Sequence, residues 1–413
     1  MVSRPTAWSV AIVAMLTMTV SYIDRSTLAV LADSVTKALH ITETQYGWLQ
    51  SAFSIAYLVA TPLSGWWIDR IGARRGLVAS ILVWTAVSAL QAIAPGFGAL
   101  FILRIALGLA EGPSFPGAAQ TNQRILPPGE RARGFGVLFT GSSIGGMIAP
   151  QLASYLFRVT GSWRIAFAGS ALVGLVWIPL WIAVTWRRDV RAQLDVPPPP
   201  REEPRSLGPR IGGALREYVE LLKHPNMIRA LIAILGAAPV IGFVLLWAAK
   251  YLGRAWHVEQ GDIGHYLWLP PLIFDVATIA FGDLASRRKR PDGAPPRLLF
   301  AIGVLLAATL AFLPLADTRW HAVVQMGIAM AGGGIIYMLV TTDLLSRMPP
   351  HRTALAGGTV ASGQSFALIV TSPLIGMSVD RFHSFDVAVV VLGLWMLPCG
   401  AYWILKRPTE SRH

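Results

Sequence analysis

The sequence predicts an all-α membrane protein with twelve transmembrane helices arranged in two pseudo-symmetric six-helix bundles. Of its 413 residues, 54% are hydrophobic and only 14% are charged, whereas soluble domains carry about 25% charged residues. The charges gather between apolar runs of about 20 residues, the length that an α-helix needs to cross a bilayer. A Pro-Pro pair recurs at matching places in the two halves of the chain, which predicts the pseudo-symmetry.

Hydropathy divides the apolar runs into two sets of six. The first set lies near residues 8–32, 46–68, 77–94, 99–122, 133–157 and 164–186. The second set lies near residues 227–252, 265–285, 298–315, 321–345, 353–379 and 385–405. We therefore expect one bundle over residues 1–186, a cytoplasmic linker over 187–226 and a second bundle over 227–413. Four consecutive prolines and mixed charges mark the linker.

The internal repeat is defined by the Pro-Pro pairs at 127–128 and 349–350, each followed by a span rich in small residues. Aligning the halves through these pairs places Arg104 and Glu111 opposite Met326 and Gly333, which cannot ionise. Two halves related by an axis along the membrane normal are a common plan of transporters. The repeat thus favours a transporter whose charged chemistry lies in its first half.

The formal net charge of +13 does not indicate a nucleic-acid partner. The cations are concentrated in alternate loops, as after the second span, while the loop at 95–98 has none. This is the positive-inside pattern of a protein whose partner is the lipid bilayer. We expect both termini in the cytoplasm and the chain in a bacterial-type inner (plasma) membrane.

The first and fourth predicted spans each contain two charged side chains: Asp24 and Arg25 in the first, and Arg104 and Glu111 in the fourth. Such a group costs several kcal/mol at bilayer depth and is by default a functional-site hypothesis. Arg104 and Glu111 are seven residues apart, so they lie nearly on one helix face, about 10 Å apart. Arginine suits a carboxylate, and an apolar site favours a protonated acid. The set predicts anion binding coupled to proton movement; the alternative is ion pairs that only hold helices together.

Residues 65–75 read Gly-Trp-Trp-Ile-Asp-Arg-Ile-Gly-Ala-Arg-Arg. This segment resembles the G-x-x-x-D-R-x-G-x-R-R loop of the major facilitator superfamily. The motifs Tyr-Ile-Asp-Arg at 22–25 and Arg-Ile-Ala-Leu-Gly-Leu-Ala-Glu-Gly at 104–112 resemble one branch, the anion:cation symporters, which include sugar-acid transporters. The resemblance covers essentially the whole chain. It implies the major facilitator fold and a cytoplasmic gating latch made by Gly65, Asp69, Arg70 and Arg74.

A finer resemblance, to the hexuronate transporters, rests on Gly-Ser-Ser-Ile-Gly at 141–145, on Trp247 with Lys250, and on Asp275. The chain departs from that group in three places: Ala249 replaces the usual proline, residues 280–282 read Ala-Phe-Gly in place of the usual Gly-Gly, and Gln364 stands where an asparagine is frequent. The resemblance implies a proton-coupled symporter that imports an organic anion, with a hexuronate or aldonate as the expected substrate.

Together the buried charges and the resemblance give each residue an expected role. Glu111 would be the principal proton carrier and Asp24 the second. Arg25 and Lys250 would contact the substrate, and Arg104 would organise Glu111 and the site. The four charges could instead be structural ion pairs.

Three further substrate ligands are expected at Tyr57, Ser143 and Gln364. Each could equally serve as a helix–helix contact. Lys250 has an alternative too, which is pairing with Asp275 instead of contacting the substrate.

Rival functions are a transporter of another small carboxylate, a proton-coupled drug exporter and a non-transporting sensor or scaffold. Drug exporters usually carry Gly-Pro…Gly-Gly in the fifth span, but residues 145–150 read Gly-Gly-Met-Ile-Ala-Pro. Arg25 and Arg104 would also repel cationic drugs. The sequence contains no nucleophile–base or metal-ligand set, and Cys399 is its single cysteine. We therefore expect no enzyme, no metal, no cofactor beyond the coupling proton, and a monomer.

Overall fold

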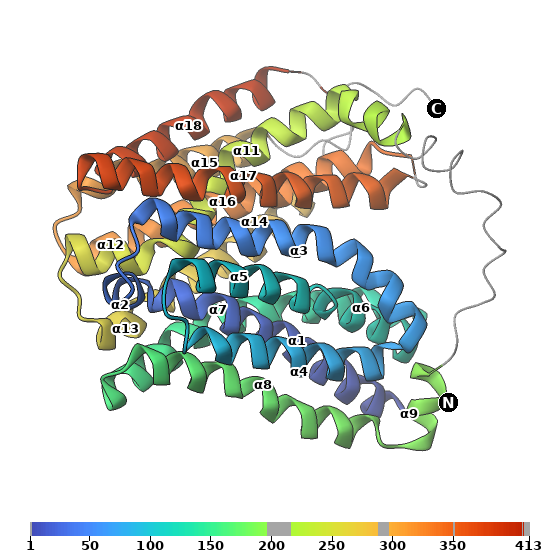
Figure 1. The fold of residues 1–413 in the computed structure, drawn as a ribbon. Coiled ribbons are helices and arrows are strands. Elements are labelled where there is room, and N and C mark those ends of the chain that lie inside the picture. The colour runs from blue at the N-terminus through green and yellow to red at the C-terminus, as the bar shows by residue number, and fades with distance from the viewer. Residues whose placement is uncertain (1, 196–215, 288–296, 350–351, 407, 409–413) are drawn as a thin grey trace. The chain divides into compact units, whose positions relative to one another are not determined.

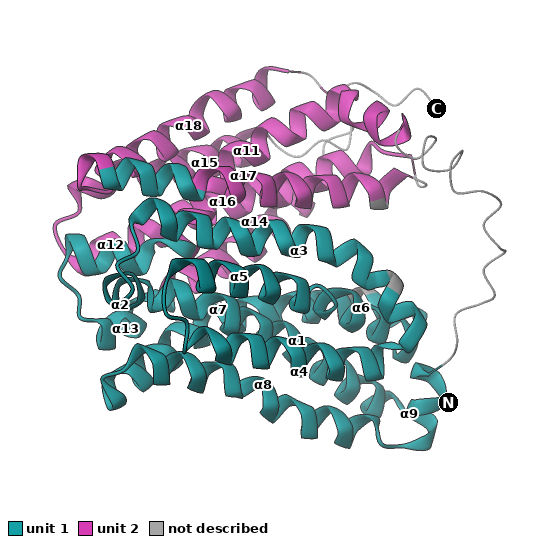
Figure 2. Cartoon of the chain, viewed as in Figure 1, with its two compact units in different colours: residues 1–199, 246–268, 372–380 teal, residues 200–245, 269–371, 381–413 magenta. Residues whose placement is uncertain are grey.

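The computed structural model describes residues 2–195, 216–287, 297–349, 352–406 and 408, and every regular element in these ranges is a helix (Figure 1). The chain forms two compact units that alternate along the sequence (Figure 2). The first unit consists of Met1–Pro199, Leu246–Trp268 and Ser372–Asp380. The second consists of Pro200–Leu245, Leu269–Thr371 and Arg381–His413. The domains predicted from the sequence, at 1–186, 187–226 and 227–413, are consecutive along the chain, and this division stays a prediction.

The first half of the chain is a series of long helices joined by short turns. They are α1 (Arg4–Val30), α2 (Ala32–Ala38), α3 (Glu43–Ile71), α4 (Ala73–Gln91), α5 (Phe97–Glu111), α6 (Ser114–Ile125), η1 (Pro128–Glu130), α7 (Arg131–Thr160), α8 (Trp163–Thr185) and α9 (Arg188–Leu194). The short α9 lies within the predicted linker, so that the linker begins with an ordered helix.

The second half repeats this pattern. Its elements are α11 (Pro225–Leu246), α12 (Ala248–Ala255), η2 (Gln260–Asp262), α13 (Ile263–Leu267), α14 (Leu269–Arg287), α15 (Arg297–Ala308), η3 (Thr309–Leu315), α16 (Arg319–Ser346), α17 (Thr353–Phe382) and α18 (Asp386–Leu405). Residues 216–223, which lie in the predicted linker, are also helical.

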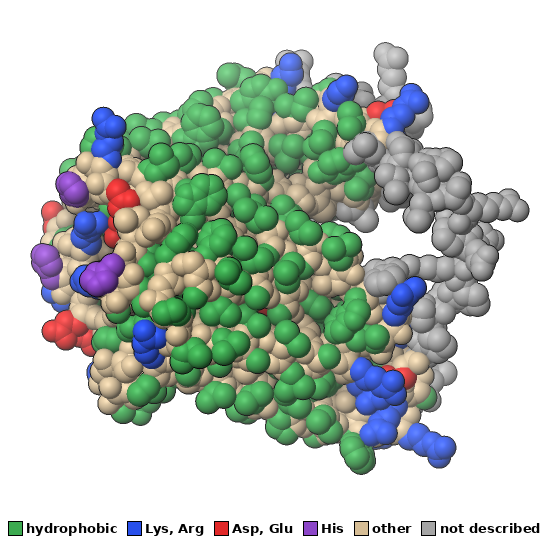
Figure 3. All heavy atoms as spheres, in the orientation of Figure 1, with side chains coloured by type: hydrophobic (Ala, Val, Ile, Leu, Met, Phe, Trp, Pro, Cys, Tyr) green, Lys and Arg blue, Asp and Glu red, His purple; other side chains and the backbone are tan. Residues whose placement is uncertain are grey.

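Within the described residues, ten helical segments are long and apolar enough to cross a membrane. The helices α3 and α7, with 29 and 30 residues, also have the length of a span. Together these correspond to the twelve spans predicted from hydropathy. Hydrophobic side chains cover the middle of the visible face, as expected for contact with lipid (Figure 3).

Helix α3 shows how local sequence fixes an element. Thr42 and Gln45 form a reciprocal capping box: the Gln45 amide donates to Thr42 Oγ1 at 3.1 Å, and the Thr42 amide donates to Gln45 Oε1 at 3.0 Å. The helix ends at Gly72, whose φ of +81° favours glycine. Between these ends, Glu43, Tyr46, Gln50, Phe53 and Tyr57 recur at helical spacing on one face.

Glycines allow the helices of the first unit to approach closely. In this unit α1 packs against α7 and α8, and α3 packs against α5. A Cβ on Gly145 would collide with the Thr19 carbonyl of α1, and one on Gly108 would collide with the Phe53 carbonyl of α3. Gly108 thus brings α5 close to the face of α3 that carries Phe53.

In the second unit, α16 packs against α14 and α15. Met326 is fully buried, and Gly333 lies against Ile241 of α11. The two positions that align with Arg104 and Glu111 are therefore packing positions in the second half.

Substitution of Gly145 tests the contact between α1 and α7, and Gly146 is the matched control because a Cβ there meets open space. We expect Gly145→Ala to lower the apparent unfolding temperature in detergent by roughly 3–10 °C, because the helices must separate. Gly146→Ala should leave it unchanged or raise it, since alanine favours helix. Equal effects of the two substitutions would contradict the close packing.

Candidate functional site

The centre of the first unit holds a buried ion pair between α1 and α5. Arg25 Nη2 lies 2.8 Å from Glu111 Oε2, and the Glu111 side chain is fully buried. Ser21, one turn before Arg25, donates to the same oxygen at 2.7 Å and accepts from Arg25 Nη2 at 2.7 Å. The acid of α5 thus pairs with the arginine of a neighbouring helix.

Three aromatic rings surround the Arg25 guanidinium. Its carbon lies 4.5 Å from the centroid of the Tyr22 ring, 5.1 Å from that of Phe53 and 4.7 Å from that of Tyr57. Phe53 and Tyr57 stack on each other. Because aromatic faces attract cations, this cage holds Arg25 in place, and the uncharged rings do not neutralise its guanidinium. The structure thus brings Tyr57, a predicted substrate ligand, to Arg25.

Arg104 turns from α5 toward α3. Its Nη2 donates to Gln50 Oε1 at 2.9 Å, and its Nε donates to the Leu49 carbonyl at 3.4 Å. Gln50 Nε2 in turn donates to the Tyr46 hydroxyl at 2.8 Å, which donates to the Leu246 carbonyl at 2.6 Å. We call the Arg104–Gln50–Tyr46–Leu246 chain of hydrogen bonds the α3 relay. Sequence reasoning missed Gln50 and Tyr46, although their spacing with Tyr57 on one face of α3 was a usable signal.

Asp24 faces a different neighbour from Arg25. It is 1% exposed, and its Oδ1 accepts a hydrogen bond from Ser88 of α4 at 3.1 Å. Residues adjacent on a helix point about 100° apart, which explains why the two side chains diverge. Asp24 and the Arg25-bound Glu111 thus lie on separate sides of α1.

Several charged atoms at the centre have no hydrogen-bond partner among the described residues. They are Asp24 Oδ2, Arg25 Nε, Arg104 Nη1 and Glu111 Oε1, all buried. Unpaired buried polar groups are costly and native proteins have few of them. The guanidinium donors can receive an anion, and the carboxylate oxygens can receive a proton.

The other predicted substrate ligands lie on separate elements. Ser143 is half-buried on α7, between two glycines that pack against α1. Gln364 is half-buried on α17 in the second unit. Lys250 lies on α12 in the first unit, where its Nζ donates to Thr36 Oγ1 at 2.7 Å and lies 3.1 Å from Glu43 Oε2. Their roles toward a substrate stay predictions.

The predicted gating motif connects α3, α4, α6 and α9. Asp69 Oδ1 accepts from Gln120 Nε2 of α6 at 2.8 Å. Arg74 forms an ion pair with Asp195. Its Nε donates to Asp195 Oδ2 at 3.0 Å, and its Nη2 donates to the same oxygen at 2.7 Å. A Cβ added at Gly65 would meet open space, and the Arg70 side chain is exposed.

The helix α9 is attached to this motif. Val190 and Leu194 are fully buried, and Arg124 donates to the Leu194 carbonyl at 2.6 Å. The composition of the linker gave no sign of this docking, because seven residues are too few for a clear periodic pattern.

The twelve spans, the internal repeat and a buried Arg–Glu pair define a multi-pass membrane transporter. The profile of the Major Facilitator Superfamily matches residues 14–371. The chain therefore belongs to the Major Facilitator Superfamily. This family membership confirms the predicted fold and the prediction that the protein is a transporter and not an enzyme.

Characterised relatives are transporters of sugar acids. A hexuronate transporter of Bacillus subtilis is 28% identical over 91% of this chain and 88% of its own. A probable galactarate/D-glucarate transporter of the same organism is 25% identical over 94% and 88%. The hexuronate transporter of Escherichia coli K12 is 26% identical over 74% and 71%.

Solved structures share the fold. A bacterial homolog of the human lysosomal transporter Spinster, in an inward-facing and unoccupied conformation, aligns with a TM-score of 0.79 at 17% identity, over 98% of this chain and 97% of that chain. A peptide transporter, POT, aligns with a TM-score of 0.72 at 16% identity, over 96% and 95%.

The pair between Arg74 and Asp195 leads to a prediction about α9. We expect Asp195→Asn to speed tryptic cleavage after Arg191 by about two- to fivefold, because a partly exposed ion pair stabilises the docked segment by no more than about 1 kcal/mol. Asp189→Asn is the control for this bond, since among the described residues Asp189 pairs with the neighbouring Arg187. Cleavage is followed by mass spectrometry, and equal rates in the two variants would contradict the docking role.

Proposed function

We propose that the protein is a proton-coupled symporter that imports a sugar acid, a hexuronate or aldonate, across the bacterial inner membrane by alternating access. The observation that carries this proposal is the Arg25–Glu111 pair inside its aromatic cage. Glu111 occupies on Arg25 the place that a substrate carboxylate would take. The names of the relatives support a sugar acid as the substrate class.

Proton coupling follows from competition for Arg25. While Glu111 is ionised, its carboxylate neutralises Arg25. A proton on Glu111 removes that charge and leaves Arg25 to bind the carboxylate of a substrate. The proton on Glu111 and the anion on Arg25 then enter together, and this pair of groups stays electrically balanced, which lowers the cost of closing the site within the membrane. Ser21 bridges the two groups and can donate to either carboxylate.

The remaining predicted residues have separate roles in this proposal. Arg104, with its unpaired Nη1, supports the anion from α5. Asp24 is the second proton carrier. Tyr57, Ser143 and Gln364 bind substrate hydroxyls. Lys250 is a further substrate contact from the second half of the chain, once it leaves its present partners.

The orientation belongs to the same proposal. Lys and Arg side chains gather at the end of the first unit that carries the N-terminus, whereas acidic and His side chains mix with them at the opposite end (Figure 3). By the positive-inside rule, this distribution supports a cytoplasmic location for the N-terminal end and for the gating motif.

The competing functions differ in what Arg25 and Arg104 would bind. A transporter of another small carboxylate uses the same arginines, so only a ligand screen separates it from a sugar-acid transporter. A cationic drug gains nothing from two buried arginines, which makes a drug exporter the weaker candidate. Thermal shifts with glucuronate, galacturonate, galactonate, gluconate and lactate rank the carboxylates.

Arg25→Ala should weaken binding of the best carboxylate by about 100-fold or more, measured by calorimetry. Since this change leaves Glu111 without its partner, the double variant Arg25→Ala/Glu111→Gln keeps the core neutral and should also fail to bind. Arg158→Gln, on the exposed end of α7, is the control and should bind normally. Unchanged affinity in both Arg25 variants would refute the contact.

Glu111→Gln should abolish proton-driven accumulation in proteoliposomes while substrate exchange across the membrane continues. A glutamine cannot carry the proton, but it leaves Arg25 free for the substrate. Asp24→Asn should reduce accumulation less, because Asp24 does not compete for Arg25. Full concentrative uptake by the Glu111 variant would remove this residue from the coupling role.

A further inference from the structure

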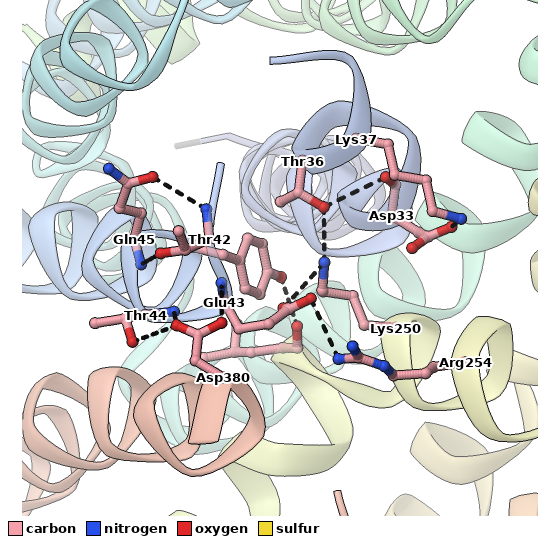
Figure 4. Close-up of polar contacts among 12 residues, drawn as sticks. Asp33, Thr36, Lys37, Thr42, Glu43, Thr44, Gln45, Lys250, Arg254 and Asp380 are labelled. Atoms are coloured by element: carbon pink, nitrogen blue, oxygen red, sulfur yellow. Dashed lines mark hydrogen bonds and ion pairs between the residues drawn. The ribbon is translucent and has the colours of Figure 1, made fainter. Parts of the chain in front are cut away.

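An ion cluster lies at the end of the first unit opposite the N-terminus (Figure 4). We call it the Glu43 cluster; it consists of Thr36, Glu43, Lys250, Arg254 and Asp380. Lys250 Nζ lies 3.1 Å from Glu43 Oε2, and Arg254 Nη1 lies 3.7 Å from Glu43 Oε1. Lys250 also donates to Thr36 at 2.7 Å. The Lys250 side chain is only 3% exposed, so its charge is held in a poorly hydrated place.

Asp380 of α17 extends the cluster to the first turn of α3. Its Oδ1 accepts from the Glu43 amide at 3.0 Å, and its Oδ2 accepts from the Thr44 amide at 2.8 Å and the Thr44 hydroxyl at 2.6 Å. The first amides of a helix have no partner within the helix and favour a negative charge. Asp380 thus caps α3 from a distant part of the chain.

The backbones at this place touch without intervening side chains. A Cβ on Gly376 of α17 would collide with the Glu43 carbonyl, and one on Gly47 of α3 would collide with the Ser372 carbonyl. Such contact orders both helix ends, so the charges of the cluster meet at fixed positions.

The members of the cluster come from the two halves of the sequence. Thr36 and Glu43 belong to the first half, whereas Lys250, Arg254 and Asp380 belong to the second. All five residues belong to the first compact unit. We take the two halves of the sequence, and not the two compact units, as the bodies that rock about the site in alternating access. Opening at this end then separates these partners.

We propose that the Glu43 cluster is a latch that holds the transporter closed at the end opposite its N-terminus and that breaks once in each transport cycle. The proposal requires alternating access but not any particular substrate. Because Lys250 is buried only while it is paired, opening exchanges its protein partners for water, and the latch can be reversible.

The latch is joined to the central site by the α3 relay. Tyr46 donates to the carbonyl of Leu246, and Trp247 packs edge-on against the Tyr46 ring with centroids 4.8 Å apart. Lys250 Nζ lies 5.3 Å from the centroid of the same ring. Arg104 thus reaches Tyr46 through Gln50, and Lys250 lies against the Tyr46 ring, so that Tyr46 is the residue shared by the central site and the latch.

The test measures the opening directly, without substrate. Spin labels are placed at the exposed positions Ala38 and Glu259 of the full chain, in a Cys399→Ala background that has no other cysteine. Pulsed electron paramagnetic resonance gives the distribution of distances between the labels. We expect a single short distance with the latch intact, and Lys250→Met should raise the population at longer distance about tenfold or more.

Lys37→Met is the matched control, because Lys37 is an exposed lysine at the same end and pairs within its own helix, with Asp33. It should leave the distribution unchanged. Glu43→Gln, which keeps the side-chain shape, should act like Lys250→Met and carries the test if that variant fails to fold.

The latch is refuted if Lys250→Met and Glu43→Gln both leave the distances as Lys37→Met does. A shift in distances in these variants, together with failure of the unsubstituted protein to transport any sugar acid, would keep the latch and reject the proposed substrate. The two outcomes are therefore separable.

Discussion

The arrangement of the first unit depends on keeping one opposite-charge pair, Arg25 and Glu111, inside an apolar bundle. Burying two charges costs several kcal/mol per ion unless geometry and further hydrogen bonds compensate. Ser21 supplies those bonds, and the rings of Tyr22 and Tyr57 supply an attractive face for the cation. The compensation is incomplete, since Arg25 Nε and Glu111 Oε1 have no partner among the described residues. The proposed coupling rests on this incomplete compensation, because a proton on Glu111 or an anion at Arg25 would satisfy the remaining atoms.

The two halves of the chain use buried charge differently. In the second unit, Asp343 Oδ2 lies 2.6 Å from Arg229 Nη1, and Asp343 Oδ1 lies 2.8 Å from Arg347 Nε. The guanidinium carbon of Arg229 lies 3.7 Å from the centroid of the Trp403 ring. Both carboxylate oxygens of Asp343 are paired with an arginine, which fits a structural clamp, although Arg347 Nη2 has no partner among the described residues. Neither Arg229 nor Asp343 stood out in the sequence, because both lie close to the ends of their spans, where charges are expected.

The sequence predicted the helices far better than their contacts. Hydropathy and length determine which segments cross a membrane, so the spans were readable, and so were the four charges within them. The pairing of Arg25 with Glu111 was not readable, because spacing along one helix gives only the relative direction of its own side chains. Which face meets which neighbour depends on close contacts such as that of Gly108 with α3. Lys250 and Glu43 are more than 200 positions apart in the sequence, and no local sequence pattern can reveal such a pairing.

Helix α3 explains why these distant features belong to one mechanism. Its first turn carries Glu43, its middle carries Gln50 and Tyr57 beside the two arginines, and its last turn carries Asp69 of the gating motif. Pro62 lies between the middle of α3 and its last turn and has no backbone N–H to donate, so the hydrogen-bond ladder of α3 is interrupted there. The turns from Glu43 to Tyr57 precede this proline and form one continuous stretch of helix. A tilt of this stretch would connect the partners of Arg25 and Arg104 with the Glu43 cluster, whereas a connection to Asp69 has to pass the bend that a proline introduces.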